Sequence, residues 1–160
     1  MQMWLFVLAF IALFVINVYT TGPRGDSERI QYLAGIKYRL DKPYRLKVKL
    51  NSDNIVCRHV SYTDGELLID REFVWDGVTG MWINESAAMR GSLVHDAIYH
   101  LIRECGIDDS NAKIADDLLY QFSREDGVSW TLAQIMHYTT KYLGPYGRDP
   151  SFNAKSHYTS

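Results

Sequence analysis

The chain begins with a long apolar stretch, and such a stretch has to be kept away from water. Residues 3–16 (MWLFVLAFIALFVI) are all apolar, and Val18 and Tyr19 extend the run. A helix that spans a bilayer needs about 20 apolar residues, with roughly 17 as the lower limit. A cleavable signal peptide would show basic residues before the run and a small-residue cleavage site after it, and the sequence shows neither. We therefore expect residues 1–19 to form an uncleaved membrane anchor, with residues 3–19 in contact with the bilayer.

The flanks of the run favour one orientation of the predicted single-pass protein. Trp4 and Tyr19 bracket the run, as aromatic residues do at membrane interfaces. Arg24 and Arg29 follow it, whereas the α-amine is the sole basic group before it. Because cytoplasmic flanks are enriched in Lys and Arg, this asymmetry favours a cytoplasmic C-terminal domain and leaves the opposite orientation open.

The rest of the chain divides into a linker, a domain and a tail. Residues 20–29 (TTGPRGDSER) are polar and contain Gly, Pro and Ser, which predicts a linker. Residues 30–147 are enough for one domain with a sizeable core, and residues 148–160 form a polar tail. The formal net charge is −2, so we expect no nucleic-acid partner.

The first half of the domain has the two-residue periodicity of strands. In 44–50 (YRLKVKL), apolar residues alternate with basic ones, which predicts one buried and one solvated face. The segments 55–62 and 66–75 are also strand-like, and the turn 63–65 (TDG) between them is typical of a hairpin. Together these segments predict one small antiparallel sheet.

The second half has helical periodicity. Apolar residues at spacings of three and four predict three helices: one from near Ser86 to Glu104, one capped by Asp109 or Ser110 with its apolar stripe at 114–122, and one from near Thr131 to Gly144-Pro145. The first two should be antiparallel neighbours, because the link between them is short. The predicted fold is α+β: a small antiparallel β-sheet, then a three-helix bundle, behind one N-terminal transmembrane helix.

The chain has two cysteines, Cys57 and Cys105, with no Cys-x-x-Cys motif or Cys/His cluster around them. A structural zinc site is therefore not expected. One disulfide is compatible with this pair, but free buried cysteines commonly act as small apolar residues. We therefore expect two buried thiols.

One predicted helix, LVHDAIYHLIRE, combines a core stripe with a polar cluster. His95 and Tyr99 are one turn apart on the same face, and Asp96 is adjacent. The next helix runs back alongside and carries Asp116 and Asp117 near its middle. A carboxylate that accepts a bond from one ring nitrogen of His95 fixes the tautomer and leaves the other nitrogen able to take a proton from water. Either Asp116 or Asp117 could take this role on the residues alone.

A glycine-containing turn, 76–80 (DGVTG), follows the last predicted strand. Such turns can direct backbone groups towards a ligand, so Gly77 and Gly80 are candidate binding positions. Asp76 adds a carboxylate oxygen, and Asp96 is free for a second role. Both aspartates are therefore candidate ligands of a hard cation.

The order of these motifs resembles a small family of phage and prophage proteins whose function is unknown (domain of unknown function one-three-five-three). Members of that family have a strand leading into a G-F-x-T-D-G-x-S turn, a helix with H-D-x-x-Y, a helix with A-D, and a third helix that ends near a glycine. The corresponding segments are EFVWDGVT at 72–79, HDAIY at 95–99, AD at 115–116 and the helix 131–144. The resemblance covers residues 66–147 and implies a phage accessory, virion or host-interaction protein, with a phage or host protein as partner.

The H-D-x-x-Y helix also resembles the active-site helix of secreted phospholipase A2. In that family the histidine is the general base, the adjacent aspartate binds calcium with loop carbonyls, and a tyrosine and a distant aspartate brace the histidine. The resemblance implies that His95 is the base and Asp96 a calcium ligand. Tyr99 and Asp116 would be the brace, and the segment 77–80 part of the calcium loop. The implied substrate is a phospholipid or another ester, whose carbonyl the calcium would polarise.

Two hypotheses of function follow. The first is a membrane-anchored lipid or ester hydrolase with a phospholipase A2-like His/Asp site. The second is a non-enzymatic phage-type protein in which the same cluster only stabilises the helix hairpin, because many buried polar groups are bonded without any chemistry. His59 is expected on a strand, and neither it nor His100 nor His137 has a motif partner.

Overall fold

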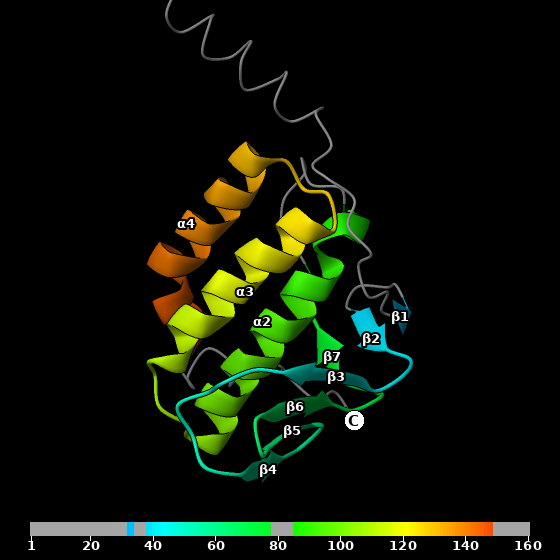
Figure 1. Ribbon diagram of the computed structural model, residues 1–160, viewed down its shortest axis with the longest axis vertical. Helices are drawn as coiled ribbons and strands as arrows, with labels where there is room; N and C mark the ends of the chain where they lie inside the picture. Colours follow the sequence, from blue (N-terminus) through cyan, green and yellow to red (C-terminus); the bar gives the residue numbers. More distant parts are fainter. Residues whose placement is uncertain (1–31, 34–37, 78–84, 149–160) are drawn as a thin grey trace, which may run out of the picture.

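The domain consists of small sheets packed against a group of three helices (Figure 1). This computed structural model describes residues 32–33, 38–77 and 85–148. Within these residues the strands come first in the chain and the helices second, so the predicted α+β class is confirmed.

The predicted anchor, linker and most of the predicted tail fall on other parts of the chain. Residues 1–19, 20–29 and 149–160 lie outside the described residues. None of the helices in the described ranges combines the length and the apolar character that a membrane crossing requires. The membrane anchor therefore stays a prediction.

Within the described residues, seven short strands form two antiparallel sheets, where the sequence predicted one. The first sheet has the order β1-β2-β7 and the second the order β3-β6-β5-β4. The strands are β1 (Tyr32–Leu33), β2 (Tyr38–Leu40), β3 (Tyr44–Lys47), β4 (Ile55–Cys57), β5 (Val60–Thr63), β6 (Glu66–Ile69) and β7 (Val74–Trp75). Their inward residues, such as Val60, Leu67 and Ile69, belong to the core that the sheets share with the helices.

Residues in the left-handed conformation divide the predicted strands. His59 has a φ of 64° and lies in the turn between β4 and β5, so the prediction of one strand across 55–62 is wrong. Glu72 has a φ of 74° and separates β6 from β7, which belong to different sheets. Positive φ is uncommon outside glycine, so the hydrophobic pattern gives no sign of either break. The hairpin turn is where it was predicted, and Asp64 and Gly65 both have the positive φ that a type I′ turn requires.

In the described part of the chain that follows the strands there are three helices, α2 (Glu85–Cys105), α3 (Asn111–Glu125) and α4 (Trp130–Arg148). Figure 1 shows them side by side, with α3 between α2 and α4. The helix α2 contacts both sheets as well as α3, and its residues Leu93, Val94, Ile98 and Leu101 are fully buried. The central position of α2 explains how one helix contains both core residues and a polar cluster that faces its neighbour.

The helix ends differ from the prediction in two places. The helix α4 continues through Gly144 and Pro145 to Arg148, so the prediction that Gly144-Pro145 ends it is wrong. Ser110 takes the N-cap position of α3, but its side chain makes no capping bond. Instead, the Asp108 carboxylate accepts a 2.8 Å bond from the Ser110 N–H.

A glycine permits the close approach of α2 and α3. A Cβ placed on Gly91 would lie 3.0 Å from the Leu119 carbonyl oxygen and 3.2 Å from Leu119 Cδ1. A side chain at this position would therefore have to push the two helices apart. Their small separation brings the middle of α3 within hydrogen-bond reach of α2.

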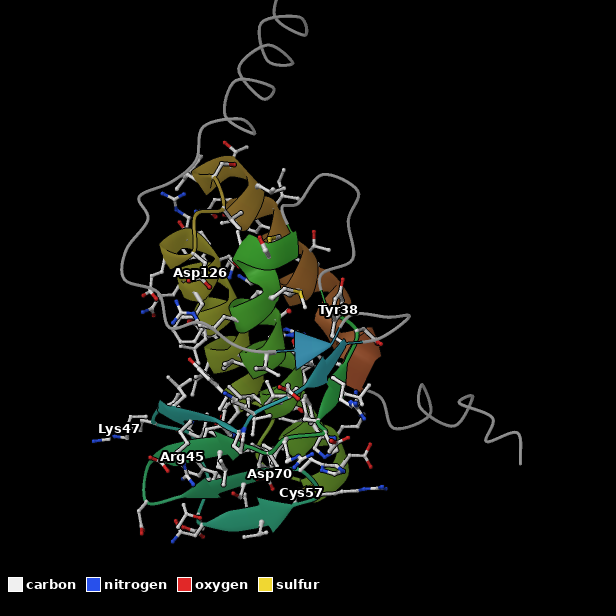
Figure 2. All side chains as sticks on the ribbon, turned by 90° about the vertical axis from the view of Figure 1, so that its right-hand side faces the viewer. Tyr38, Arg45, Lys47, Cys57, Asp70 and Asp126 are labelled. Atoms are coloured by element: carbon white, nitrogen blue, oxygen red, sulfur yellow. A yellow bond between two sulfur atoms is a disulfide. The ribbon has the colours of Figure 1, made fainter. Side chains whose placement is uncertain are left out.

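Cys57, at the end of β4 (Figure 2), and Cys105, at the end of α2, form a disulfide with their Cα atoms 6.2 Å apart. The expectation of two free thiols is therefore wrong. The two residues are separated by 48 positions, and the packing of α2 against β4 is what brings them together. The bond ties one sheet to the C-terminal end of the helix that carries His95.

Candidate functional site

The polar residues of α2 form a cluster with one carboxylate of α3. His95 Nε2 lies 3.1 Å from Asp116 Oδ1, and His95 Nδ1 lies 3.1 Å from Asp96 Oδ1. The Tyr99 hydroxyl donates to the same oxygen of Asp116 over 3.1 Å. The structure thus brings together four of the residues that the sequence suggested, and Asp116 rather than Asp117 contacts His95.

Helix geometry explains this arrangement. His95 and Tyr99 are one turn apart, and their rings stack with centroids 4.2 Å apart at an angle of 29°. The helices α2 and α3 run antiparallel on either side of the turn at Gly106. His95 and Asp116 lie at nearly equal distances along the chain from that turn, so they are level with each other across the helix pair.

Burial and charge act in opposite directions on His95. The side chains of His95 and Asp116 are only 12% and 9% exposed. Burial alone would lower the pKa of His95, but the bonds to Asp116 and Asp96 raise this pKa to about 9. At neutral pH the ring is therefore a cation that donates a hydrogen bond from both nitrogens. In this state His95 has no nitrogen free to accept a proton.

Asp96 is the more accessible of the two carboxylates, with 31% of its side chain exposed. Its Oδ1 bonds to His95, and the described residues supply no hydrogen-bond donor to its Oδ2. Carboxylate oxygens are the ligands that hard cations prefer, so Asp96 suits the cation-binding role in part. Within the described ranges, however, no group of three His, Cys, Asp or Glu side chains is placed to hold a metal ion.

The turn after β7 lies only partly within the described residues. Asp76 is exposed. Gly77 has a φ of 72°, and a Cβ on it would collide with the Tyr38 ring, so both conformation and space require glycine here. Gly80 and the rest of the predicted loop lie outside the described residues.

His137 on α4 also reaches the cluster, and the sequence motifs did not predict this. Its Nδ1 lies 3.3 Å from the Asp116 carbonyl oxygen, and its ring packs edge-on at 5.8 Å from Tyr120. The sequence does contain a signal for the position of His137, which is an equal spacing of residues. His95 to Asp116 and Asp116 to His137 are both separations of 21 residues, each centred near a tight turn. Three antiparallel helices joined in this way place the three residues at one level.

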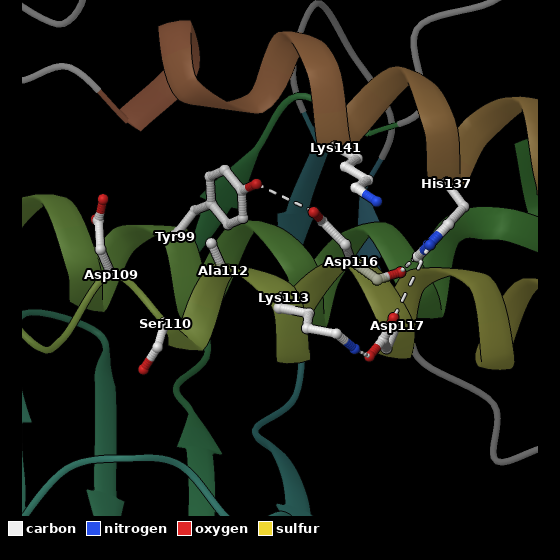
Figure 3. Close-up of a pocket in the computed structure, with 9 residues that line it drawn as sticks. All are labelled: Tyr99, Asp109, Ser110, Ala112, Lys113, Asp116, Asp117, His137 and Lys141. Carbon is white, nitrogen blue, oxygen red and sulfur yellow. Dashed lines mark hydrogen bonds and ion pairs between the residues drawn. The ribbon is translucent and has the colours of Figure 1, made fainter.

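A pocket of about 360 Å³ lies beside this cluster (Figure 3). All three helices contribute to its lining, which includes Tyr99, Lys113, Asp116, Asp117, His137 and Lys141. Figure 3 shows the side chains of Lys141 and His137 reaching from α4 towards α3. The pocket touches the Tyr99–Asp116 pair, whereas His95 is absent from the described residues that line it. Among the described residues, the pocket is therefore lined by the two that bond to each other beside His95, and not by His95 itself.

His100 and His59 lie outside the cluster. His100 Nε2 lies 3.0 Å from the Arg58 carbonyl oxygen and 3.8 Å from Cys57 Sγ. Burial lowers the pKa of His100. These contacts give His100 a structural role beside the disulfide.

Comparisons with protein-family models, with curated proteins and with solved structures found no match to this chain.

Proposed function

We propose that this chain is a membrane-anchored hydrolase of phospholipids or other esters, with His95 as its general base. The observation that carries the proposal is the Asp116 carboxylate, whose Oδ1 lies 3.1 Å from both His95 Nε2 and the Tyr99 hydroxyl. A carboxylate bonded in this way selects one histidine tautomer and stabilises the imidazolium that forms when the ring takes a proton. These two bonds match the brace that the resemblance to secreted phospholipase A2 implies.

The nitrogen that remains for chemistry is Nδ1, and Asp96 must leave it before His95 can accept a proton from water. An imidazolium with a pKa of about 9 is not a base at neutral pH. Losing one carboxylate partner lowers the pKa of a histidine, because the cation is then less stabilised. Departure of Asp96 would therefore uncover Nδ1 and bring its pKa closer to neutral pH.

Asp96 is also the residue that would hold calcium, together with Asp76 and backbone oxygens of the segment 77–80. Its exposure and its oxygen without a described donor suit this role. A bound calcium ion would polarise the ester carbonyl and stabilise the oxyanion. The same ion would give Asp96 an alternative partner to His95.

The test compares His95→Asn with His59→Asn in the full-length protein in lipid nanodiscs. Release of labelled fatty acid from phospholipid is measured with calcium and with a chelator, and circular dichroism checks the fold. We expect His95→Asn to lose a factor of about 10² to 10⁴ in rate, the usual contribution of a general base. His59 is a suitable control, because asparagine tolerates its positive φ.

Asp96→Asn provides a second variant that leaves the bonds of Asp116 in place. It should retain the fold and lose the response to calcium. If the wild-type protein hydrolyses neither phospholipids nor short-chain esters in calcium, the proposal is refuted.

A second function is favoured by a different observation, the occupation of both ring nitrogens of His95. An imidazolium bonded to two carboxylates, one of them on the neighbouring helix, stabilises the helix pair and needs no catalytic role to account for it. On this alternative the chain is a non-enzymatic phage-type protein that binds a phage or host protein. His95→Asn should then lower the melting temperature and the biological activity together. A variant that melts like the wild type but has lost its function would contradict this alternative.

A further inference from the structure

The outward side of α4 carries a row of exposed apolar residues. We call Ile135 (42% exposed), Tyr138 (53%) and Tyr142 (67%), which share one side of the helix at spacings of three and four, the α4 aromatic face; Trp130 (57%) is exposed in the first turn of the same helix. These are four of the six large apolar residues that are exposed in the described part of the chain. Such a concentration on one helix indicates an interaction surface.

The composition of this face suits the boundary between a bilayer and water. Tryptophan and tyrosine have an apolar body and a polar tip, a combination that is enriched at membrane interfaces. Polar residues are interleaved with them, and the Lys141 ammonium lies 6.0 Å from the centroid of the Tyr142 ring. A lysine in this position can lay its stem along apolar surface and place its charge among lipid phosphates.

The length of the chain also limits how far the domain lies from the predicted anchor. Residues 20–31 separate the apolar run from β1. Even fully extended, this segment reaches at most about 40 Å. That reach is comparable to the diameter of a domain of this size, so an anchored domain is held with some part of its surface close to the bilayer.

We propose that the α4 aromatic face docks on the lipid interface of the bilayer and holds the pocket at the membrane surface. His137 connects the two, because its ring lies 6.0 Å from the Tyr138 ring and also lines the pocket beside Lys141. The inference deepens the proposed function, since it says which face of the domain would meet the lipid, and it rests on the membrane anchoring in that proposal.

The test places one reporter on the face and a matched one elsewhere. Tyr142→Cys and Lys47→Cys are each introduced into the full-length protein and labelled with an environment-sensitive fluorophore. Cys57 and Cys105 are joined in the disulfide and do not compete for the label. Lys47 is an exposed residue of β3 in the sheet layer, as Figure 2 shows. Both proteins are reconstituted in nanodiscs of phosphatidylcholine with phosphatidylglycerol, at one protein per disc.

We expect the label at position 142 to shift its emission to the blue and to be quenched by nitroxide lipids. It should also lose quenching by aqueous iodide, because interfacial helices lie at the boundary of headgroups and acyl chains. The label at position 47 should behave in the opposite way. Equal iodide quenching at both positions would overturn the proposal. The measurement is repeated with several copies in each disc. A blue shift that is absent at one protein per disc and appears only at the higher loading would also overturn the proposal, because it would show a second copy on the face.

A double variant separates this inference from the proposed function. Tyr138→Ser with Tyr142→Ser should reduce hydrolysis of phospholipid in discs and leave hydrolysis of a water-soluble short-chain ester unchanged. His95→Asn should reduce both. If no hydrolysis is found in any variant, the proposed function fails, while the quenching experiment still reports on docking. Equal loss on both substrates in the double variant would count against docking.

Discussion

Two buried ionic groups join α2 to α3, and they differ in whether their charge is permanent. Arg90 donates from Nε and Nη2 to the two oxygens of Asp126, over 3.1 and 3.0 Å. Its Nη2 also donates to Glu125 over 2.6 Å, and the guanidinium lies 4.1 Å over the Phe122 ring. Although burial opposes it, these carboxylates raise the pKa of Arg90, so the side chain is charged at every accessible pH.

The His95 cluster is also a buried cation bonded to two carboxylates, but its cation is titratable. His95 is bonded to Asp116 and Asp96 much as Arg90 is bonded to Asp126 and Glu125. The difference is that imidazole can lose its proton within the range of pH in which proteins remain folded. The arginine group is therefore a permanent ionic link between the two helices, whereas the histidine group can change its charge and its partners. This contrast is the physical reason for seeking function in the second group and not in the first.

The largest effect is expected from removing the permanent charge. Arg90→Met leaves the carboxylate of Asp126, whose side chain is 11% exposed, without its buried partner. Breaking a buried pair in this way costs about 3–5 kcal/mol in the free energy of unfolding, measured by urea denaturation. Arg39→Met is the control, because its pair with Glu72 is exposed and such pairs contribute less than about 1 kcal/mol. Equal losses of unfolding free energy in the two variants would show that the buried Arg90 pair contributes no more to stability than an exposed pair.

A smaller and pH-dependent effect is expected from the histidine. The folded pKa of His95, about 9, lies above its unfolded value of about 6.5, so the protonated ring is favoured by folding. The stabilisation is fully present below the unfolded pKa and is lost as the pH rises through about 9. Its upper size is about 3.5 kcal/mol, since each pKa unit corresponds to about 1.4 kcal/mol.

Urea denaturation across this window distinguishes the two groups. The wild-type protein and Arg90→Met should both lose stability between neutral pH and about pH 10, because both retain the histidine whose folded pKa is about 9. His95→Gln should show a flatter profile over the same range. A constant difference between wild type and His95→Gln at every pH would contradict the raised pKa.

The smallest effect is expected from the tyrosine of the brace. Tyr99→Phe keeps the ring that stacks on His95 and removes the hydroxyl that donates to Asp116. The loss of one such bond costs about 1 kcal/mol, measured as a change in melting temperature. The pKa of His95 should rise further, as followed by NMR, because Asp116 then has one donor fewer. Tyr120→Phe is the control, since its hydroxyl bonds to Gln134 and not to the cluster. An unchanged pKa of His95 in Tyr99→Phe would show that Tyr99 does not act on His95 through Asp116.

The centre of the cluster could be predicted from helix spacing. His95 and Tyr99 share a face because they are one turn apart, and the short link after α2 makes α3 antiparallel to it. Those two facts place the Asp116-Asp117 pair opposite His95, and the structure shows that Asp116 makes the contact. The catalytic roles and the calcium have no such geometric support, so they stay proposals.

Other features depend on packing that no short pattern encodes. Positive φ at His59 and Glu72 divides the strands, and nothing in the alternation of apolar residues reveals it. The disulfide depends on how β4 lies against α2, which the sequence positions of Cys57 and Cys105 do not indicate. The place of His137 follows from equal spacing around two turns, a relation that becomes visible only once the helices are taken as one antiparallel series.

The disulfide also makes the domain a natural reporter of membrane topology. Such bonds persist in secretory and periplasmic spaces and are reduced in the cytosol. Alkylation of cells with a mass-tagged thiol reagent would show whether Cys57 and Cys105 are oxidised, with no fusion protein added. An intact bond would place the domain on the oxidising side of the membrane, opposite to the side that Arg24 and Arg29 favour. Free thiols would agree with the arginines, and the fold would then lack a cross-link between its sheet and its central helix.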